Sequence, residues 1–293
     1  MTKTMVNSVP SYMGHFRCLA GRCAHTCCAG WEIDIDEATR AKYARVAGRF
    51  GARLSAAIEE DHFKLTGADE RCPMLNDVGL CDIIITLGED ALCQICRDHP
   101  RYVNEFEDGV ETGLGLACEA AARLILGWNE PVRWSGGRFW RDDSDDAWLL
   151  DLRDALRAQL QDRRMPLEQR LRALCPDGTP PVDAAARFLA TLETMDAAWT
   201  DCLARIAPGD DARAEDALWA EQFGVYLLDR HMPGALECGD ADARIRFVAL
   251  MTRLVCALHR RTGLPPEELC RLFSSEIEYS DENVGSILDW LSA

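Results

Sequence analysis

Apolar residues recur at helical spacing through the second half of the chain. The segment SDDAWLLDLRDALRAQLQDR places Trp148, Leu149, Leu152, Leu156 and Leu160 on one stripe. Such a stripe is typical of a helix that packs against neighbouring helices. Further segments with the same pattern are PLEQRLRALC, VDAAARFLATLETMDAAWTDCLARI, RAEDALWAEQFGVYLLDRHM, DADARIRFVALMTRLVCALHRRTG, PPEELCRLFSSEI and SDENVGSILDWLS. The pattern therefore predicts a run of packed helices.

The first part of the chain has fewer and shorter helical patterns. A helix is predicted over residues 36–58, where Asp36 is the N-cap candidate and apolar side chains follow at helical spacing. A second, short helix is predicted over 87–101 and ends near Pro100, and a third is predicted over 117–128. These segments alone do not make a continuous helical bundle.

Turn residues and short apolar runs occupy the rest of this part. The stretches 73–85 and 103–117 are compatible with small strands. The loop 129–144 contains proline, two glycines and a change of charge, so it is the predicted domain boundary. The sequence thus predicts a mainly α protein: an irregular, cysteine-rich α+β region over residues 1–130, followed by an all-α helical domain over 144–293.

Cysteine usage differs between these two parts of the chain. Of the fourteen cysteines, five in the helical part are single and far apart, as is typical of cysteines that pack as small apolar residues. The other nine fall within residues 1–118 and four of them lie inside 18–28. Clustered thiols at short spacings indicate ligands for zinc or for an iron–sulfur cluster.

Four interpretations of the clustered thiols are open: disulfides, a metal or iron–sulfur site, a redox relay, and reduced structural thiols. The first 18 residues lack the apolar core of a secretory signal, which predicts a reducing cytoplasm and disfavours disulfides. Nine thiols exceed the four ligands of one zinc ion, so a [4Fe–4S] cluster with spare cysteines, or two metal sites, fits the count better. His25 and His99 are further candidate ligands.

The charge of the chain narrows the choice of partner. A net charge of −17 argues against nucleic acid, whose phosphates attract clustered lysine and arginine. It favours a basic partner, although an acidic surface also serves solubility. No run of about 18 apolar residues occurs, so a membrane span is not expected. The oligomeric state is left open.

Three stretches together resemble the flagellin lysine-N-methylase family. They are FRCLAGRCAHTCCAGWEIDID, CPMLNDVGLCDIIITLGEDALCQICRDHPRY and GLACEAAARLILG. The likeness runs over residues 12–128 and extends to MPLEQRLRAL at 165–174. A looser likeness joins the chain to small zinc- or iron-chelating cysteine-rich proteins.

The resemblance implies transfer of a methyl group from S-adenosylmethionine to lysine side chains of flagellin, or of another lysine-bearing protein, in the bacterial cytoplasm. It also implies a [4Fe–4S] cluster, with zinc as the alternative metal. Cluster ligation carries over only to the matching cysteines, and no four of them are singled out: Cys18, Cys23, Cys27, Cys28, Cys72, Cys81, Cys93, Cys96 and Cys118.

Two familiar signatures of methyl-donor chemistry are missing from the sequence. GLGLACEA at 113–120 lacks the GxGxxG pattern, so we expect a strand end or turn there. Radical enzymes that use C-x3-C-x2-C would need a third cysteine where this chain has Gly30, and no barrel pattern follows. The catalytic and donor-binding residues are therefore unassigned, and a non-catalytic or redox zinc- or iron-binding module is the alternative function.

Overall fold

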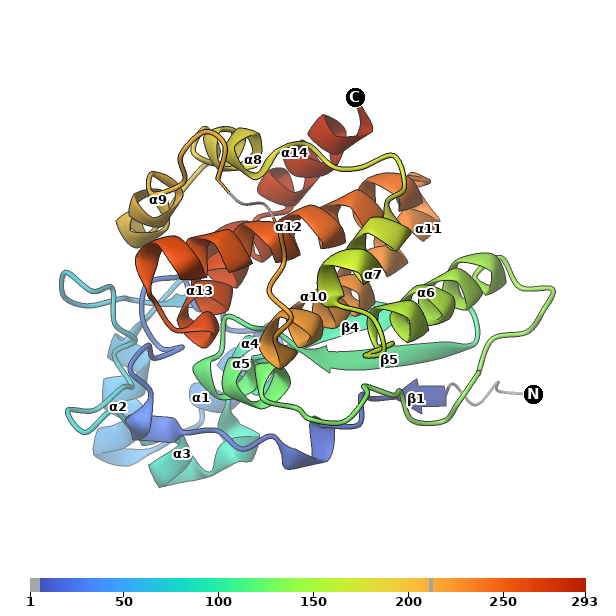
Figure 1. Cartoon of the computed structure of the whole chain (residues 1–293). Coiled ribbons are helices and arrows are strands. Elements are labelled where there is room, and N and C mark those ends of the chain that lie inside the picture. Colours follow the sequence, from blue (N-terminus) through green and yellow to red (C-terminus); the bar gives the residue numbers. More distant parts are fainter. Residues whose placement is uncertain (1–5, 211–212) are drawn as a thin grey trace. The chain divides into compact units, whose positions relative to one another are not determined.

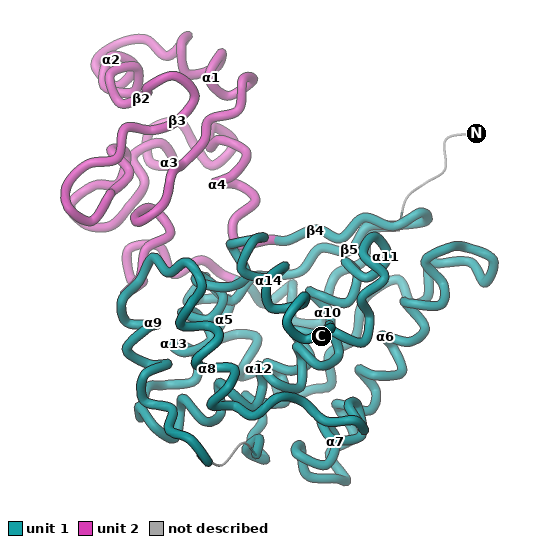
Figure 2. The backbone as a smooth tube through the Cα atoms, turned by 90° about the horizontal axis from the view of Figure 1, so that it is seen from above, with its two compact units in different colours: residues 1–16, 102–293 teal, residues 17–101 magenta. Residues whose placement is uncertain are grey.

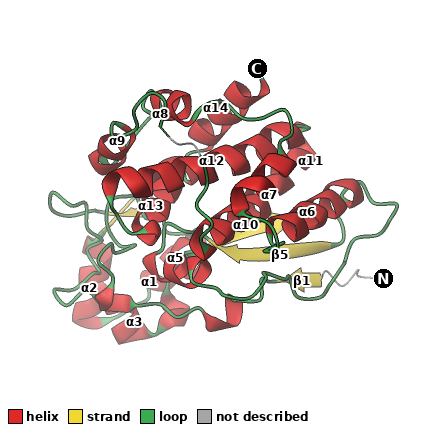
Figure 3. Cartoon of the chain, in the orientation of Figure 1, coloured by secondary structure: helices red, strands yellow, loops and turns green. Residues whose placement is uncertain are grey.

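The computed structural model describes residues 6–210 and 213–293 and is mainly helical, as the sequence predicted (Figure 3). The chain forms two compact units (Figure 2). The smaller unit comprises residues 17–101, and the larger unit comprises 1–16 together with 102–293. The smaller unit is therefore a continuous segment inserted between the two parts of the larger unit.

The larger unit is built around two buried helices, α10 (Leu218–His231) and α12 (Ala241–Thr262), which pack against each other (Figure 1). Every residue of α12 from Phe247 to Leu258 is buried. A helix that is buried on all sides needs apolar residues all round. The other helices surround this pair: α5 (Glu119–Leu126), α6 (Ala147–Leu160), α7 (Leu167–Leu174), α8 (Val182–Leu189), α9 (Ala197–Leu203), α11 (Ala235–Cys238), α13 (Pro266–Phe273) and α14 (Asp281–Ser292).

One predicted helical segment, 182–206, is divided into α8 and α9. The break is held from outside, because the buried carboxylate of Glu276 accepts hydrogen bonds from the backbone N–H groups of Met195 and Asp196 at 2.8 and 3.1 Å. The Asp196 side chain then accepts from Ala198 N–H at 2.9 Å and caps α9. Glu276 itself lies in a π-helical turn, Ser274–Glu278, between α13 and α14.

A small sheet completes the larger unit. Its strand order is β1 (Val6–Ser8), β5 (Gly109–Leu114), β4 (Arg101–Glu105), and β1 runs parallel to β5 with Val6 opposite Gly109. Strands β4 and β5 confirm the short strands predicted within 103–117. Strand β1 was not predicted, because three residues carry too little pattern.

The observed division of the chain differs from the predicted domains 1–130 and 144–293. Helix α5 packs against α10 and α13, so residues 102–130 belong with the later helices. The loop 129–144, predicted to be a boundary, lies inside the larger unit, where the Trp134 indole N–H donates to Asp229 at 3.0 Å. The sheet of this unit comes from residues before 115, and among the described residues of 144–293 the regular elements are all helices, as predicted.

The smaller unit has short elements around its own core. Its largest buried side chains include Ile33, Tyr43, Leu54, Phe63 and Met74. The elements are α1 (Glu37–Tyr43), α2 (Gly48–Ala56), β2 (Ile58–Glu59), β3 (His62–Phe63), α3 (Asp82–Leu87) and α4 (Gln94–Asp98), with single 3-10 turns at Ala20–Arg22 and Glu89–Ala91.

Two predicted helices of this unit are shorter than expected, and each is interrupted at a glycine. The helix predicted over 36–58 is the pair α1 and α2, because Gly48 adopts φ +78° at the start of α2. The helix predicted over 87–101 begins only at Gln94, after Gly88 at φ +90° and a 3-10 turn. The third, predicted over 117–128, is confirmed as α5.

The strand predicted within 73–85 is a turn followed by helix α3. The Asn76 side chain accepts hydrogen bonds from the N–H groups of Val78 and Leu80 at 3.1 and 3.0 Å, which closes the turn. Helix α3 starts directly afterwards at Asp82. Across residues 6–210 and 213–293, no helix has both the length and the apolar character to cross a membrane.

Candidate metal centre

Five thiols gather in the core of the smaller unit. Cys72 and Cys93 are buried within that core, and Cys28, Cys81 and Cys96 pack against it. Their charges are coupled: Cys28, Cys81 and Cys93 raise the pKa of Cys72, and Cys93, Cys28 and Cys72 raise that of Cys96. These couplings join Cys81 to Cys28 and Cys72, and they join Cys96 to Cys28, Cys72 and Cys93, within one core. We call Cys28, Cys72, Cys81, Cys93 and Cys96 the thiol cluster.

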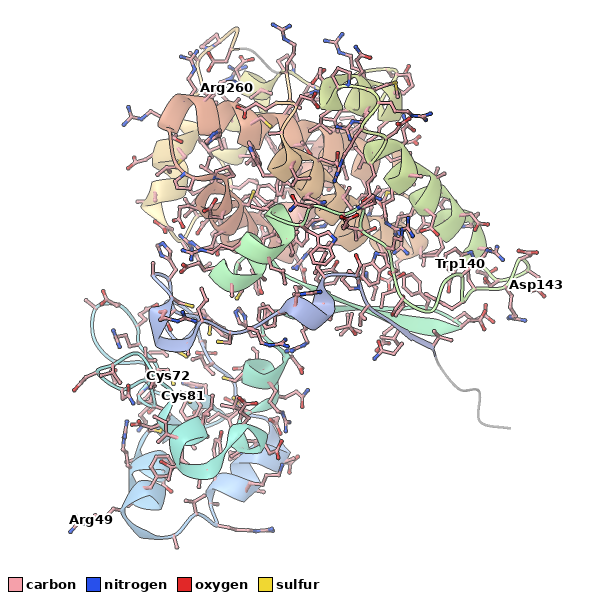
Figure 4. All side chains as sticks on the ribbon, turned by 60° about the horizontal axis from the view of Figure 1, so that its bottom comes forward. Arg49, Cys72, Cys81, Trp140, Asp143 and Arg260 are labelled. Atoms are coloured by element: carbon pink, nitrogen blue, oxygen red, sulfur yellow. The ribbon has the colours of Figure 1, made fainter. Side chains whose placement is uncertain are left out.

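Backbone hydrogen bonds bring three of these cysteines together from distant parts of the sequence. Cys72 N–H donates to the carbonyl of Cys28 at 2.8 Å. Cys81 forms a bridge with Leu75, in the turn that Asn76 closes. Figure 4 labels Cys72 and Cys81 in the smaller unit, and electrostatic coupling links the two thiols. The cluster therefore depends on turns rather than on one regular element.

The remaining two members flank the start of helix α4. Cys93 is its N-cap residue, and Cys96 lies one turn later, so both side chains are on one face. The Cys96 thiol donates a hydrogen bond to the Cys93 sulfur, which lowers the pKa of Cys93 and raises that of Cys96. The two thiols form a pair in which Cys93 is the better thiolate.

Burial keeps most of the cluster protonated at neutral pH. Desolvation raises the pKa of Cys72 to about 12 and also raises that of Cys81. Cys28 differs, because a hydrogen bond from the Cys27 thiol lowers its pKa to about 7. A metal ion or cluster binds thiolates, so loading must expel protons from the buried members.

The thiols as described hydrogen-bond to one another instead of presenting a ready coordination shell. Within residues 6–210 and 213–293, no three histidine, cysteine, aspartate or glutamate side chains are close enough to hold a metal ion without rearrangement. The Cys27–Cys28 and Cys93–Cys96 contacts would have to open for the sulfur atoms to face a common centre. The donor set, soft thiolates in an apolar pocket, still fits zinc or an iron–sulfur cluster.

The other predicted ligands lie outside the thiol cluster. Cys18 and Cys27 are exposed and Cys23 is half-buried, all within the irregular segment that precedes α1. Cys118 is the N-cap of α5 and belongs to the larger unit. All fourteen cysteines are free thiols, and the five scattered ones predicted to be structural are in the larger unit: Cys175, Cys202, Cys238, Cys256 and Cys270.

Two further largely buried side chains of the smaller unit are His99 and Tyr43, of which Tyr43 couples to the thiol cluster. The buried Nε2 of His99 has no hydrogen-bond partner among the described residues, and burial lowers the pKa of this imidazole. Its ring stacks on Trp31 with centroids 6.5 Å apart. Tyr43, which sequence reasoning did not single out, couples electrostatically to Cys93, Cys96 and Cys81 and donates to the carbonyl of Ala91 at 2.7 Å. Only its helical periodicity was visible in the sequence, and that indicated a core residue.

Comparison with known proteins finds relatives that are named as a flagellar biosynthetic protein and as lysine-N-methylases. The flagellar biosynthetic protein FliU of Salmonella muenchen is 30% identical over 140 residues, which cover 44% of this chain and 80% of FliU. The chain belongs to the flagellin lysine-N-methylase family. Lysine-N-methylases of Salmonella choleraesuis and Salmonella typhimurium are 32% and 30% identical over 142 residues, again 44% of this chain.

The likeness to these methylases is partial. The matched stretch spans only about a third of their length, 34% in each case. No family model matches the chain, and no solved structure matches it. The names of these relatives are properties of those proteins, and the roles of residues in this chain rest on its own structure.

Proposed function

We propose that the chain is a protein-lysine N-methyltransferase that uses S-adenosylmethionine and carries a [4Fe–4S] cluster. Its substrate would be lysine side chains of flagellin, or of another lysine-bearing protein, in the bacterial cytoplasm. Support comes from its relatives, which are named lysine-N-methylase and flagellar biosynthetic protein. The single observation that carries the cluster is the gathering of five thiols from three distant segments in one small core.

Four members of the thiol cluster would hold the metal. Cys72 and Cys93 are the most buried and Cys28 couples to Cys72, Cys81 and Cys96, so these five residues precede Cys18, Cys23, Cys27 and Cys118 as ligand candidates. A bound cluster supplies thiolate-ligated iron with redox chemistry. The protein's own part is to exclude water from the sulfur atoms and to fix their spacing through the turns described above.

Lysine methylation places further demands on the protein. The substrate ammonium must lose its proton, and the amine must line up with the methyl carbon on the side opposite the sulfonium. The net charge of −17 attracts a cationic lysine side chain over long range, although it does not select one. Burial keeps Cys72 and Cys81 protonated, so neither of these two thiols takes up this proton.

A second candidate is a non-catalytic or redox module that binds zinc or iron. It is favoured by one observation: the Cys93–Cys96 pair already combines a lowered and a raised pKa, as redox-active thiol pairs do. Such a module needs no methyl donor. The two functions therefore differ in whether the chain binds a methyl donor, and metal binding alone does not distinguish them.

The deciding experiment uses the full chain purified without oxygen. Iron and sulfide in a ratio near one, with the broad visible absorption of a cluster, would support iron–sulfur ligation, whereas bound zinc leaves the protein colourless. The cluster-loaded chain is then incubated with flagellin and S-adenosylmethionine, and lysine methylation is read by mass spectrometry. Methylated lysine supports the enzyme. Metal binding without any binding of S-adenosylmethionine supports the module.

A further inference from the structure

Exposed apolar side chains gather on one segment of the smaller unit. Ten large apolar side chains are exposed among residues 6–210 and 213–293, and five of them fall between residues 78 and 87. These five are Val78, Leu80, Ile84, Ile85 and Leu87. Single exposed apolar residues are common, whereas a group of them marks an interaction surface. We call these five residues the apolar surface.

Helix α3 does not need the exposed side chains for its own packing. Its buried residue is Ile83, which is 2% exposed and belongs to the core of the smaller unit. Successive residues of a helix point about 100° apart, so Ile84 and Ile85 turn away from the core that Ile83 enters. Figure 1 shows α3 on the surface of the smaller unit. Packing of the unit therefore explains Ile83 and leaves its two neighbours without a role.

Local structure brings the five residues close together. Leu80 and Ile85 occupy the N′ and N4 positions of α3, which are neighbours at the start of a helix. Ile84 and Leu87 are three residues apart on the helix and therefore lie on one face. The turn described above places Val78 directly before this group. The apolar surface is thus formed by one turn and the helix that follows it.

Contacts beneath the apolar surface hold it in shape. Asp82, the first residue of α3, is ion-paired with Arg53 and accepts a hydrogen bond from the side-chain amide of Asn76 at 2.9 Å. The turn also lies against Gly21, where an added Cβ atom would come within 2.6 Å of the Val78 carbonyl oxygen. A surface that is already formed loses less conformational entropy when a partner binds.

Negative charge borders the apolar surface. Asp77 precedes Val78, and Glu89 and Asp90 follow in the 3-10 turn that packs against α3. The three carboxylates are exposed and have no ion-pair partner within residues 6–210 and 213–293. Arg22 lies in the 3-10 turn next to Val78, so three acids against one arginine leave a surplus of two negative charges. An apolar segment flanked by lysine or arginine complements such a surface.

The same charge argues against two other occupants. A second copy of the chain would bring identical acids face to face across a symmetric interface, and like charges in that arrangement repel. An anionic membrane would be repelled in the same way. The occupant that the surface fits is therefore a protein segment that is both apolar and basic.

We propose that the apolar surface docks a lysine-bearing, amphipathic segment of the protein substrate. The inference rests on the proposed function, which requires a protein substrate. Apolar side chains of the segment cover the exposed face of α3, and its cationic side chains lie near Glu89 and Asp90. The N-cap residue of α3 is Cys81, a member of the thiol cluster. Docking therefore brings the substrate to the unit that carries the candidate metal centre.

The test replaces one exposed side chain and measures binding of purified monomeric flagellin to the full chain. Ile85 is 61% exposed, so Ile85→Asp should fold normally and weaken flagellin binding at least tenfold, which is about 1.4 kcal/mol. Val103, 55% exposed on β4 of the larger unit, provides the matched control. Val103→Asp adds the same charge and should bind like the wild-type chain. Circular dichroism checks that both variants are folded.

A charge reversal tests the acidic border of the surface. Glu89→Lys combined with Asp90→Lys should weaken flagellin binding several-fold at low salt. The difference from the wild-type chain should shrink at high salt, because exposed charges are then screened. Sedimentation of the wild-type chain and of Ile85→Asp provides a separate check. A wild-type dimer that Ile85→Asp dissociates would assign the surface to a second copy and overturn the proposal.

Failure of the docking surface and failure of the proposed function give different results. If Ile85→Asp binds flagellin as tightly as the wild-type chain does, the docking surface is wrong, and methylation of flagellin read by mass spectrometry would still support the enzyme. If the wild-type chain binds no flagellin, docking of this substrate is likewise wrong. Binding that depends on Ile85, without methylation of any lysine, would support the docking surface and reject the proposed function.

Discussion

The carboxylate of Asp36 accepts a hydrogen bond from the backbone N–H of Gln94 at 2.9 Å, across 58 residues of sequence. Its other oxygen accepts from Thr39 N–H, also at 2.9 Å, and caps α1. These two hydrogen bonds, that from Gln94 first, lower the pKa of Asp36 to about 2. One side chain therefore starts both α1 and α4, and it fixes the turn that holds Cys93.

Removing this shared cap should loosen the thiol cluster. Asp36→Ala is expected to destabilise the smaller unit by about 1–2 kcal/mol, as the loss of an N-cap does, and to weaken metal binding because α4 begins less rigidly. Thermal unfolding and equilibrium metal titration measure the two effects. Asp34→Ala, at an exposed position two residues earlier, is the control. Equal metal affinity in both variants would show that the cap does not support the site.

Cysteine replacements should separate ligands from structural thiols. Cys72→Ser and Cys81→Ser are expected to lose most of the bound metal, because both sulfur atoms belong to the thiol cluster. Cys202→Ser and Cys256→Ser, in the larger unit, should keep it. Metal per chain after anaerobic purification is the readout. The same metal content in all four variants would reject the assignment of the cluster.

The buried carboxylate of Glu278 makes the larger unit sensitive to acid. Burial by itself raises its pKa, but Arg230 and a 2.7 Å contact with His231 outweigh this and lower the pKa to about 2. A depressed pKa stabilises the fold above the unfolded-state value of 4.5, and this contribution is lost as the pH falls toward 2. The shift corresponds to about 3 kcal/mol.

Denaturant unfolding between pH 6 and pH 2 tests this contribution. Wild-type stability should fall with decreasing pH, and Glu278→Gln should be less stable at pH 6 and show a flatter dependence on pH. Burial lowers the pKa of His231, so protonation of this residue in the unfolded state acts in the same direction below pH 6.5. An unchanged pH slope in Glu278→Gln would assign the acid sensitivity to other groups.

Removing one partner of the Arg153–Glu111 ion pair should destabilise the fold far more than removing both partners. Each residue is 1% exposed. Arg153→Met leaves a buried, unpaired carboxylate and should destabilise by about 3–5 kcal/mol. The double variant Glu111→Gln with Arg153→Met removes both charges and should recover much of that loss. A double variant as unstable as the single one would mean that packing, not charge, governs this site.

The sequence predicted the helices of the larger unit well, because their apolar stripes are long and regular. It also indicated that thiols from distant segments meet, yet it could not choose among the nine. The choice among them depends on single turns and hydrogen bonds that leave no periodic pattern in the sequence. Examples are the Asn76 turn that places Cys81 and the backbone hydrogen bond that joins Cys72 to Cys28. Cys118 looked equivalent to the others in sequence but folds into the other unit.

The buried ion pairs of the larger unit could not be predicted for a different reason. Arg153 and Arg157 are four residues apart on α6, where charged residues usually face solvent. Their burial is set by Glu111 and Asp229, which lie 42 and 72 residues away. The loop with Trp134 was predicted to be a domain boundary because glycine and proline patterns indicate local turns and carry no information about distant partners.

The parallel pairing of β1 with β5 has a consequence for the order of events on the ribosome. About a hundred residues separate Val6–Ser8 from Gly109–Leu114, and at about 5–20 residues per second their synthesis takes roughly 5–20 s. Residues 17–101 are translated entirely within that interval. During biogenesis, the cysteine-rich segment is therefore synthesised, and can begin to fold, before the strand upstream of it has found its partner.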